Sequence, residues 1–128
     1  MPHIEFKYST LKGYNLPIIP IDIKGNDWET LWVFVDSGAT YSMIDFKESK
    51  RLEIDPKKGK KTYVKVADGS YIVAYLLKLP VRIGDIEVKA TIGFSEGLGI
   101  GFNIMGRKDF FENFKVCFSD KKGLIQFF

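Results

Sequence analysis

The chain has 128 residues, of which 45% are hydrophobic, including 11 Phe, 6 Tyr and 2 Trp. This length and composition predict one folded domain over residues 1–128 with a single core, and they exclude an intrinsically disordered chain. The formal net charge of only +3 argues against a nucleic-acid partner. No run approaches the roughly 20 apolar residues that span a bilayer, and the N-terminus lacks the apolar core of a signal peptide, so we expect a cytoplasmic protein with no membrane association.

Short strand signals, separated by glycines, recur along the whole chain. We expect strands at residues 4–8, 16–23, 31–35, 42–44, 62–67, 71–79, 81–83, 86–92, 114–118 and 124–128. Hairpin turns are expected at residues 68–69, 84–85 and 120–123, which carry Asp and Gly. Two short helices are expected, one at residues 45–52 with Asp45 as its N-terminal cap and one of about two turns at residues 107–113. The sequence therefore predicts a mostly β fold.

Residue types that commonly carry chemistry are sparse. The basic cluster at residues 57–61 is interpreted as a solvated turn before a strand rather than as a phosphate-binding patch. Cys117 is the single cysteine, so it cannot form an intrachain disulfide, and we expect a core or interface residue rather than a nucleophile. Because His3 is the only histidine, the sequence argues against a Ser-His-Asp triad, a Cys-His pair and a His-rich metal site. We expect no metal and no cofactor.

One carboxylate stands at an abrupt turn between two strand-like segments. The apolar run at residues 31–35 favours a buried strand, and Asp36-Ser37-Gly38 ends it. Asp36 should therefore lie at a strand end with a tightly fixed backbone, where a partly desolvated carboxylate is a candidate acid or base. The tripeptide alone is weak evidence, because Asp, Ser and Gly are ordinary turn formers.

Three ordered segments strengthen this interpretation: residues 34–40 (Phe-Val-Asp-Ser-Gly-Ala-Thr), 66–71 (Val-Ala-Asp-Gly-Ser-Tyr) and 103–111 (Asn-Ile-Met-Gly-Arg-Lys-Asp-Phe-Phe). Together they resemble the retropepsin-like aspartic peptidases, the family of the retroviral proteases and their cellular and microbial relatives. In that family the first segment is the active-site loop, the second is the tip of the flap hairpin, and the third is an apolar-apolar-Gly-Arg segment with the helix that follows it. The resemblance covers roughly residues 16 to 119 and implies an acid-protease barrel with one lobe per chain.

The resemblance implies that Asp36, Ser37 and Gly38 are the catalytic segment and that Ala39 binds substrate beside them. Ser37 replaces the commoner Thr but keeps the hydroxyl, which in the family forms a hydrogen bond across the dimer behind the catalytic pair. The chemistry needs two carboxylates about 3 Å apart that share one proton. Since the chain has one Asp-Ser-Gly, the second carboxylate should be Asp36 of an identical chain across a two-fold axis. A homodimer acting on a peptide or unfolded protein is therefore expected.

The turn at residues 68–69 has two interpretations. By itself it is an ordinary surface turn. In combination with Asp36 it becomes the tip of a lid that excludes water and donates backbone hydrogen bonds to an extended peptide. On the second interpretation, which the resemblance supports, Ala67, Asp68, Gly69 and Ser70 contact the substrate.

Two further features leave alternatives open. Arg107 is either a solvated residue at a helix start or a buried tether to the active-site loop; the acidic partner of the matching retroviral arginine is missing here, where Thr40 and Tyr41 stand. The terminal Phe127-Phe128 is expected to be buried in the dimer interface, to be buried in its own core, or to mark a cut through an ordered element. The resemblance favours the dimer interface, since dimers of the family often use terminal strands.

Two functions are consistent with these residues. The first is a homodimeric aspartic endopeptidase with the two Asp36 side chains as its catalytic pair. The second is a non-catalytic peptide-binding or dimerisation module that keeps the same fold, because a fold does not imply a function. The separation of the two Asp36 carboxylates in a dimer would distinguish them.

Overall fold

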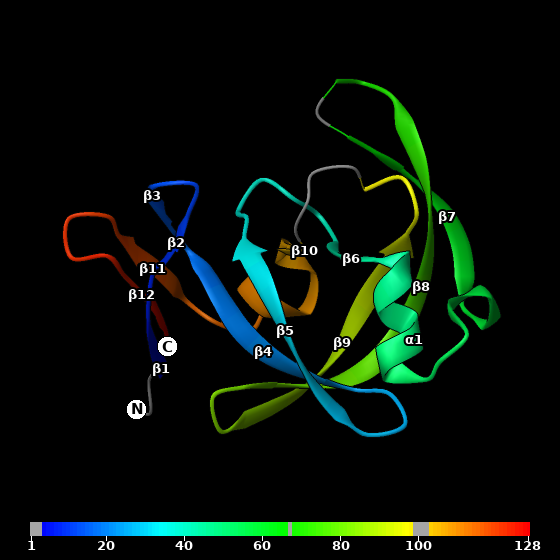
Figure 1. Ribbon diagram of the computed structural model, residues 1–128, viewed down its shortest axis with the longest axis horizontal. Coiled ribbons are helices and arrows are strands. Elements are labelled where there is room, and N and C mark those ends of the chain that lie inside the picture. The colour runs from blue at the N-terminus through cyan, green and yellow to red at the C-terminus, as the bar shows by residue number, and fades with distance from the viewer. Residues whose placement is uncertain (1–3, 67, 99–102) are drawn as a thin grey trace.

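The computed structural model describes residues 4–66, 68–98 and 103–128 as a mostly β protein, as expected (Figure 1). Its strands are β1 (Ile4–Lys7), β2 (Ser9–Leu11), β3 (Tyr14–Leu16), β4 (Ile18–Lys24), β5 (Trp28–Val35), β6 (Ser42–Asp45), β7 (Lys60–Lys65), β8 (Tyr71–Ile83), β9 (Ile86–Ser95), β10 (Asn103–Met105), β11 (Val116–Ser119) and β12 (Leu124–Phe127). The helical segments are short: η1 (Phe46–Glu48), α1 (Ser49–Leu52), η2 (Pro56–Lys58) and η3 (Arg107–Phe111).

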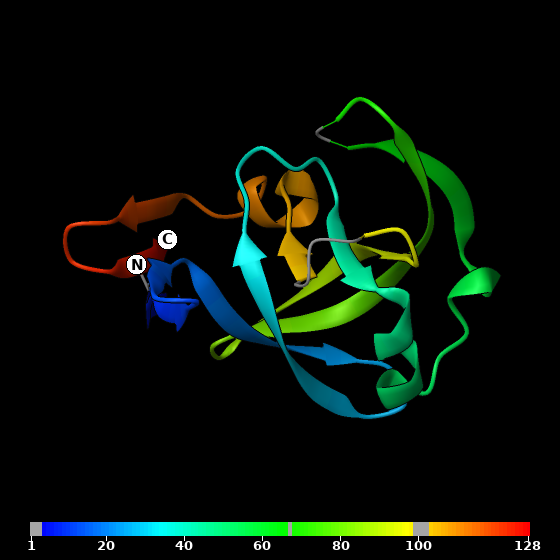
Figure 2. The same cartoon turned by 45° about the horizontal axis from the view of Figure 1, so that its top comes forward.

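The larger sheet closes into a barrel. Its seven strands follow the order β4-β5-β10-β6-β9-β8-β7, and β4 also pairs with β8, so the sheet curls back on itself (Figures 1 and 2). Alternate side chains point inward along each strand, which explains why Ile19, Ile21 and Ile23 of β4 are buried. They meet inward residues of other strands, such as Val33 and Phe94, in one apolar core. The expected acid-protease barrel is confirmed.

The three expected hairpin turns are present. Gly69, Gly84 and Gly123 have φ values of 89°, 59° and 65°, in the left-handed region that favours glycine. Asp45 caps the following helical turn as expected, because its Oδ1 accepts a hydrogen bond of 3.0 Å from the Lys47 N–H. These local signals were sufficient to predict where the chain reverses.

Two strand predictions were wrong. Residues 71–79 and 81–83 are one strand, β8, which continues through Pro80. Proline is tolerated there because β7 pairs with β8 only as far as Leu76 and β4 only from Val81, so no described strand pairs with this edge of β8 at Pro80. Residues 9–15 received no strand assignment, yet β2 and β3 form a hairpin whose turn residues Lys12 and Gly13 both have positive φ, at 51° and 82°.

The prediction of a two-turn helix at residues 107–113 was also wrong. The segment η3 ends at Phe111, and Lys108 and Asp109 have non-helical backbone angles. Asp109 has a φ of 67°, and its carboxylate accepts a hydrogen bond of 2.7 Å from the Thr91 N–H of β9. This hydrogen bond ties Asp109 to the barrel in a left-handed backbone conformation, which a regular right-handed helix does not contain.

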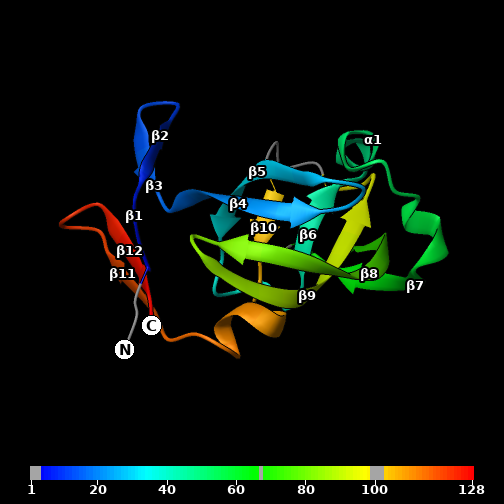
Figure 3. The ribbon, with the colours of Figure 1, turned by 90° about the horizontal axis from the view of Figure 1, so that it is seen from below.

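A second, three-stranded sheet joins the two ends of the chain beside the barrel, with the order β1-β12-β11 (Figure 3). Phe127 is buried in the core of its own chain, and its ring meets those of Phe6 and Phe114 edge to face, with centroids 6.1 and 5.8 Å away. Phe128 is 36% exposed. The expectation that the dimer interface buries the terminal aromatics is therefore wrong for Phe127, which β12 places between two strands of the same chain.

The remaining predictions concern isolated residues. The basic residues 57, 58, 60 and 61 are exposed on η2 and the start of β7, which confirms a solvated turn before a strand. Cys117 is half-buried on β11 and is a free thiol. Within residues 4–66, 68–98 and 103–128, no helix is both long and apolar enough to cross a membrane.

Candidate active site

Asp36 follows the last residue of β5, and its backbone is fixed by a strand from a distant part of the chain. β10 lies between β5 and β6, parallel to β5 and antiparallel to β6. The Asp36 N–H donates a hydrogen bond of 2.9 Å to the carbonyl oxygen of Met105, at the end of β10. One residue earlier, the Val35 N–H donates to the Pro17 carbonyl, also at 2.9 Å. The strand end that carries the carboxylate is thus held from both sides.

The Asp36 side chain is half-buried and turns back over its own loop. Its Oδ1 accepts a hydrogen bond of 2.9 Å from the Gly38 N–H, and its carbonyl oxygen accepts one of 3.3 Å from the Ala39 N–H. Ser37 and Gly38 are exposed and Ala39 is half-buried. The structure therefore brings Asp36, Ser37, Gly38 and Ala39 into one tight turn.

The outer side of this loop is clamped by the start of η3. The Arg107 and Lys108 N–H groups donate hydrogen bonds of 2.8 Å to the carbonyl oxygens of Ala39 and Thr40. The Arg107 guanidinium adds a hydrogen bond of 3.3 Å to the Ser37 carbonyl oxygen. Through these bonds Arg107 tethers the active-site loop, as one of the two alternatives expected. The residue is exposed, however, and not buried as that alternative expected.

Two residues behind the loop were missed as site residues. Gly106 is buried so closely against the loop that an added Cβ would collide with the Tyr41 carbonyl group and lie 2.9 Å from the Ala39 carbonyl oxygen. Its N–H donates a hydrogen bond of 2.9 Å to the buried Ser42 hydroxyl. The Met-Gly-Arg sequence gave a signal for Gly106, whereas nothing local distinguished Ser42, because its role depends on a contact 64 residues away.

The predicted flap is the hairpin of β7 and β8. Across its tip, the Val66 N–H donates to the Ser70 carbonyl oxygen and the Gly69 N–H donates to the Val66 carbonyl oxygen, both at 2.9 Å. Asp68 Oδ1 accepts from the Ser70 hydroxyl at 2.5 Å and from the Ser70 N–H at 2.9 Å. The hydrogen bonds from the Ser70 side chain and then its backbone lower the pKa of Asp68 below its ordinary value. Ala67 lies outside the described residues.

The tip of the flap and the active-site loop rise on the same side of the molecule (Figures 1 and 2). Within the described residues, no hydrogen bond or ion pair joins Asp36 or its loop to Asp68, Gly69 or Ser70. Two shallow hollows, of about 280 and 220 Å³, lie beside η3 and at the base of the flap, and Asp36 lines neither.

Comparisons with known proteins agree with this geometry. The family model described as aspartyl protease matches residues 19–95. The crystal structure of a retropepsin-like aspartic protease from Rickettsia conorii is similar, with a TM-score of 0.69, 22% identity and 98% of each chain covered. The EIAV protease complexed with the inhibitor HBY-793 has a TM-score of 0.57 and 22% identity, over 77% of this chain and 88% of that one. No curated protein matches the chain.

The family match extends from β4 to the end of β9, more than half of the 128 residues, and includes the Asp36 loop and the flap. The two solved structures share the barrel, and because they are only 22% identical to this chain, the similarity shows the fold alone. From the sequence match and the shared fold together, the chain belongs to the aspartyl protease family and has the fold of the retropepsin-like aspartic proteases.

Proposed function

We propose that this chain is an aspartic endopeptidase that is active as a homodimer, with one Asp36 from each chain in a shared site. The observation that carries the proposal is the placement of Asp36. It stands half-buried at a strand end, in a loop that hydrogen bonds fix from both sides, and the sequence has one Asp-Ser-Gly. A fixed loop costs no reorganisation when the reaction begins.

The proposed reaction is the attack of water on a peptide carbonyl. Two Asp36 carboxylates about 3 Å apart cannot both be ionised, so one carries a proton. The ionised carboxylate takes a proton from a water bound between the pair while the water attacks, and the protonated carboxyl donates a hydrogen bond to the carbonyl oxygen. The Gly38 N–H, which already bonds Asp36 Oδ1, would hold each carboxylate in the orientation that this exchange requires.

The flap supplies a proposed way to hold the substrate. Gly69 at its tip has nothing within 4 Å of an added Cβ, so an extended peptide backbone has room to approach it. We infer that backbone groups near Asp68, Gly69 and Ser70 pair with the peptide as one strand pairs with another. Closure of the hairpin would then exclude water from the reacting carbonyl group.

The test compares wild type with Asp36→Asn on an unfolded polypeptide over acidic to neutral pH. We expect the substitution to reduce cleavage by about a thousandfold, within the range for loss of an acid–base group. Asp85→Asn is the matched control, because Asp85 is an exposed residue in the β8–β9 turn, and it should cleave like wild type. Equal cleavage by wild type and Asp36→Asn would contradict the proposal and point to a contaminating peptidase.

The alternative of a non-catalytic peptide-binding or dimerisation module predicts a different result. Such a protein would bind the polypeptide without cleaving it at any pH, and Asp36→Asn would leave the binding affinity unchanged. Folded wild-type protein that behaves in this way would favour the alternative.

A further inference from the structure

Arg107 is a cation beside the Asp36 loop that has no carboxylate partner in the described chain. Its guanidinium is always charged, and it donates a hydrogen bond of 3.3 Å to the neutral carbonyl oxygen of Ser37. Across residues 4–66, 68–98 and 103–128, no carboxylate oxygen lies within 4.0 Å of this guanidinium, although four other ion pairs meet that limit. The positive charge of Arg107 is therefore uncompensated next to the loop that carries Asp36.

The acidic residues of the same segment are engaged with other groups. Glu112 Oε1 accepts a hydrogen bond of 2.9 Å from the Asp109 N–H and forms an ion pair of 3.7 Å with Lys108 Nζ. The Asp109 carboxylate accepts from the Thr91 N–H of β9. The hollow beside η3 is lined by two cations, Arg107 and Lys108, and by one anion, Glu112, so its net charge is +1.

This hollow has room for a side chain. Its volume is about 280 Å³, and one water molecule occupies roughly 30 Å³ in the liquid, so a carboxylate-bearing side chain fits together with a few waters. Four of its lining residues are exposed and Phe111 is half-buried, which provides an apolar wall for the methylene groups of such a side chain. The lining residues are Thr40, Arg107, Lys108, Phe111 and Glu112.

The guanidinium, rather than the backbone, is the group that would select a ligand here. The N–H groups of Arg107 and Lys108 already donate to the carbonyl oxygens of Ala39 and Thr40. The guanidinium is planar and has five N–H donors, which match the two oxygens of a carboxylate. The hydrogen bond from Nη1 to the Ser37 carbonyl oxygen ties this group to the active-site loop. A carboxylate is therefore the ligand that fits both the charge and the donors.

The hollow is close enough to Asp36 for one bound peptide to reach both. Thr40, which lines the hollow, is four residues after Asp36, and four residues span at most about 14 Å. An extended peptide advances roughly 3.3 Å per residue, so a residue about four positions from the cleaved bond can lie beside the hollow. Figure 2 shows η3 directly beside the Asp36 loop, in agreement with the hydrogen bonds that join them.

We propose that this hollow is a specificity site that binds the side-chain carboxylate of a Glu or Asp residue in the polypeptide substrate. The inference rests on the proposed function, because it assigns a charge preference to the substrate of that peptidase. Arg107 binds the carboxylate, and no covalent bond forms or breaks there. Since each chain of the homodimer contributes one Arg107, acidic residues are favoured on both sides of the cleaved bond.

The first experiment measures the preference in peptides. A neutral parent peptide is altered at one position at a time, up to about four residues on each side of the cleaved bond, with Glu or its neutral isostere Gln. We expect kcat/KM to be about fivefold higher with Glu than with Gln at one position on each side, near the upper end of what an exposed ion pair contributes. Equal values at every position would overturn the proposal.

The second experiment changes the charge of the hollow. Arg107→Gln should cleave the Glu and Gln peptides equally, Arg107→Lys should keep part of the preference, and Arg107→Glu should instead prefer a Lys peptide over the Gln peptide. Each readout is a ratio within one protein, so a general loss of activity through the Ser37 hydrogen bond cancels. If Arg107 only supports the loop, Arg107→Gln would lower both rates and leave the ratio at about fivefold, which would overturn the proposal.

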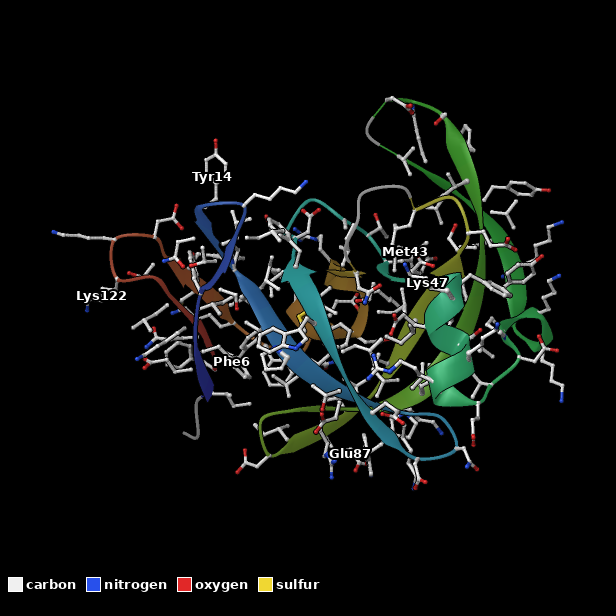
Figure 4. The ribbon with its side chains drawn as sticks, viewed as in Figure 1. Phe6, Tyr14, Met43, Lys47, Glu87 and Lys122 are labelled. Carbon is white, nitrogen blue, oxygen red and sulfur yellow. The ribbon has the colours of Figure 1, made fainter. Side chains whose placement is uncertain are left out.

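Two control variants remove a cation from other surfaces. Arg51 on α1 pairs with Glu29 and Glu48, and Lys122 points away from the body of the molecule at the turn between β11 and β12 (Figure 4). Arg51→Gln and Lys122→Gln should both keep the preference for Glu. Loss of the preference in either control would mean a general effect of net charge and would overturn the proposed site.

A binding measurement separates this inference from the proposed function. Asp36→Asn is titrated with the same peptides carrying a fluorescent label, and the Glu peptide should bind about fivefold more tightly than the Gln peptide. The additional change Arg107→Gln should abolish that difference. A wild type that cleaves no peptide would contradict the endopeptidase, and the affinity ratio would still decide the site. If Arg107→Gln dissociates the homodimer in sedimentation and leaves the affinity ratio unchanged, Arg107 is an interface residue and the proposal is wrong.

Discussion

The active-site loop and the flap are both glycine-containing turns between strands, yet they are held in different ways. The loop is fixed by residues far away in sequence, because Met105, Arg107 and Lys108 all donate or accept hydrogen bonds with its backbone. The flap tip is held only by bonds among residues 66–70 within the described chain. A turn fixed by the core is rigid, whereas a turn fixed by itself can open locally. The difference is consistent with the proposed roles of the loop as a preformed catalytic segment and of the hairpin as a lid.

The largest expected effect comes from adding a methyl group to one glycine in each region. Gly106→Ala would force a Cβ against the Tyr41 carbonyl group, and we expect it to lower the free energy of unfolding by about 3 kcal/mol. Gly69→Ala has free space, and only its positive φ opposes the change, so we expect a smaller loss of about 1–2 kcal/mol. Denaturant unfolding of both variants measures the two losses. If both variants lost the same unfolding free energy, the proposed difference between a loop fixed by the core and a flap tip fixed by itself would be contradicted.

A smaller effect is expected from deleting one hydroxyl in each region. Ser42→Ala leaves the buried Gly106 N–H without an acceptor, which should cost about 1–3 kcal/mol. Ser70→Ala removes a hydroxyl at the exposed flap tip and should cost less than about 0.5 kcal/mol. The same unfolding measurement applies, with circular dichroism to verify that each variant is folded. A costly Ser70→Ala would show that the flap tip belongs to the cooperative core.

The smallest effect is a pH dependence confined to the flap tip. Hydrogen bonds from Ser70 lower the pKa of Asp68 in the folded turn, so the turn gains stability above the pKa of the unfolded chain and loses it as the pH falls below about 4. Amide hydrogen exchange at Ser70 should therefore lose protection in acid before the Asp36 N–H does. In Asp68→Asn the acid-dependent step at Ser70 should disappear; its persistence would assign the step to another group.

The sequence was informative where a local rule decides the structure. Turn glycines such as Gly84, the cap Asp45 and the abrupt end of β5 at Asp36 each follow from the residue and its neighbours, and all were predicted. The position of β10 between β5 and β6, the role of Ser42 and the enclosure of β12 between β1 and β11 depend on contacts across the whole chain. The β2–β3 hairpin was missed although Lys12-Gly13 offered a turn signal, because Lys is uncommon at positive φ.

The central claim is that Asp36 is half of a site, and mixing chains tests it most directly. Wild type is combined with Asp36→Asn at fixed total concentration, the subunits are allowed to exchange, and cleavage is measured as the wild-type fraction decreases. If both carboxylates are required, activity follows the square of that fraction, so an equal mixture retains about one quarter of the wild-type rate. If each chain holds a complete site, the equal mixture retains about one half, and that result would contradict the account.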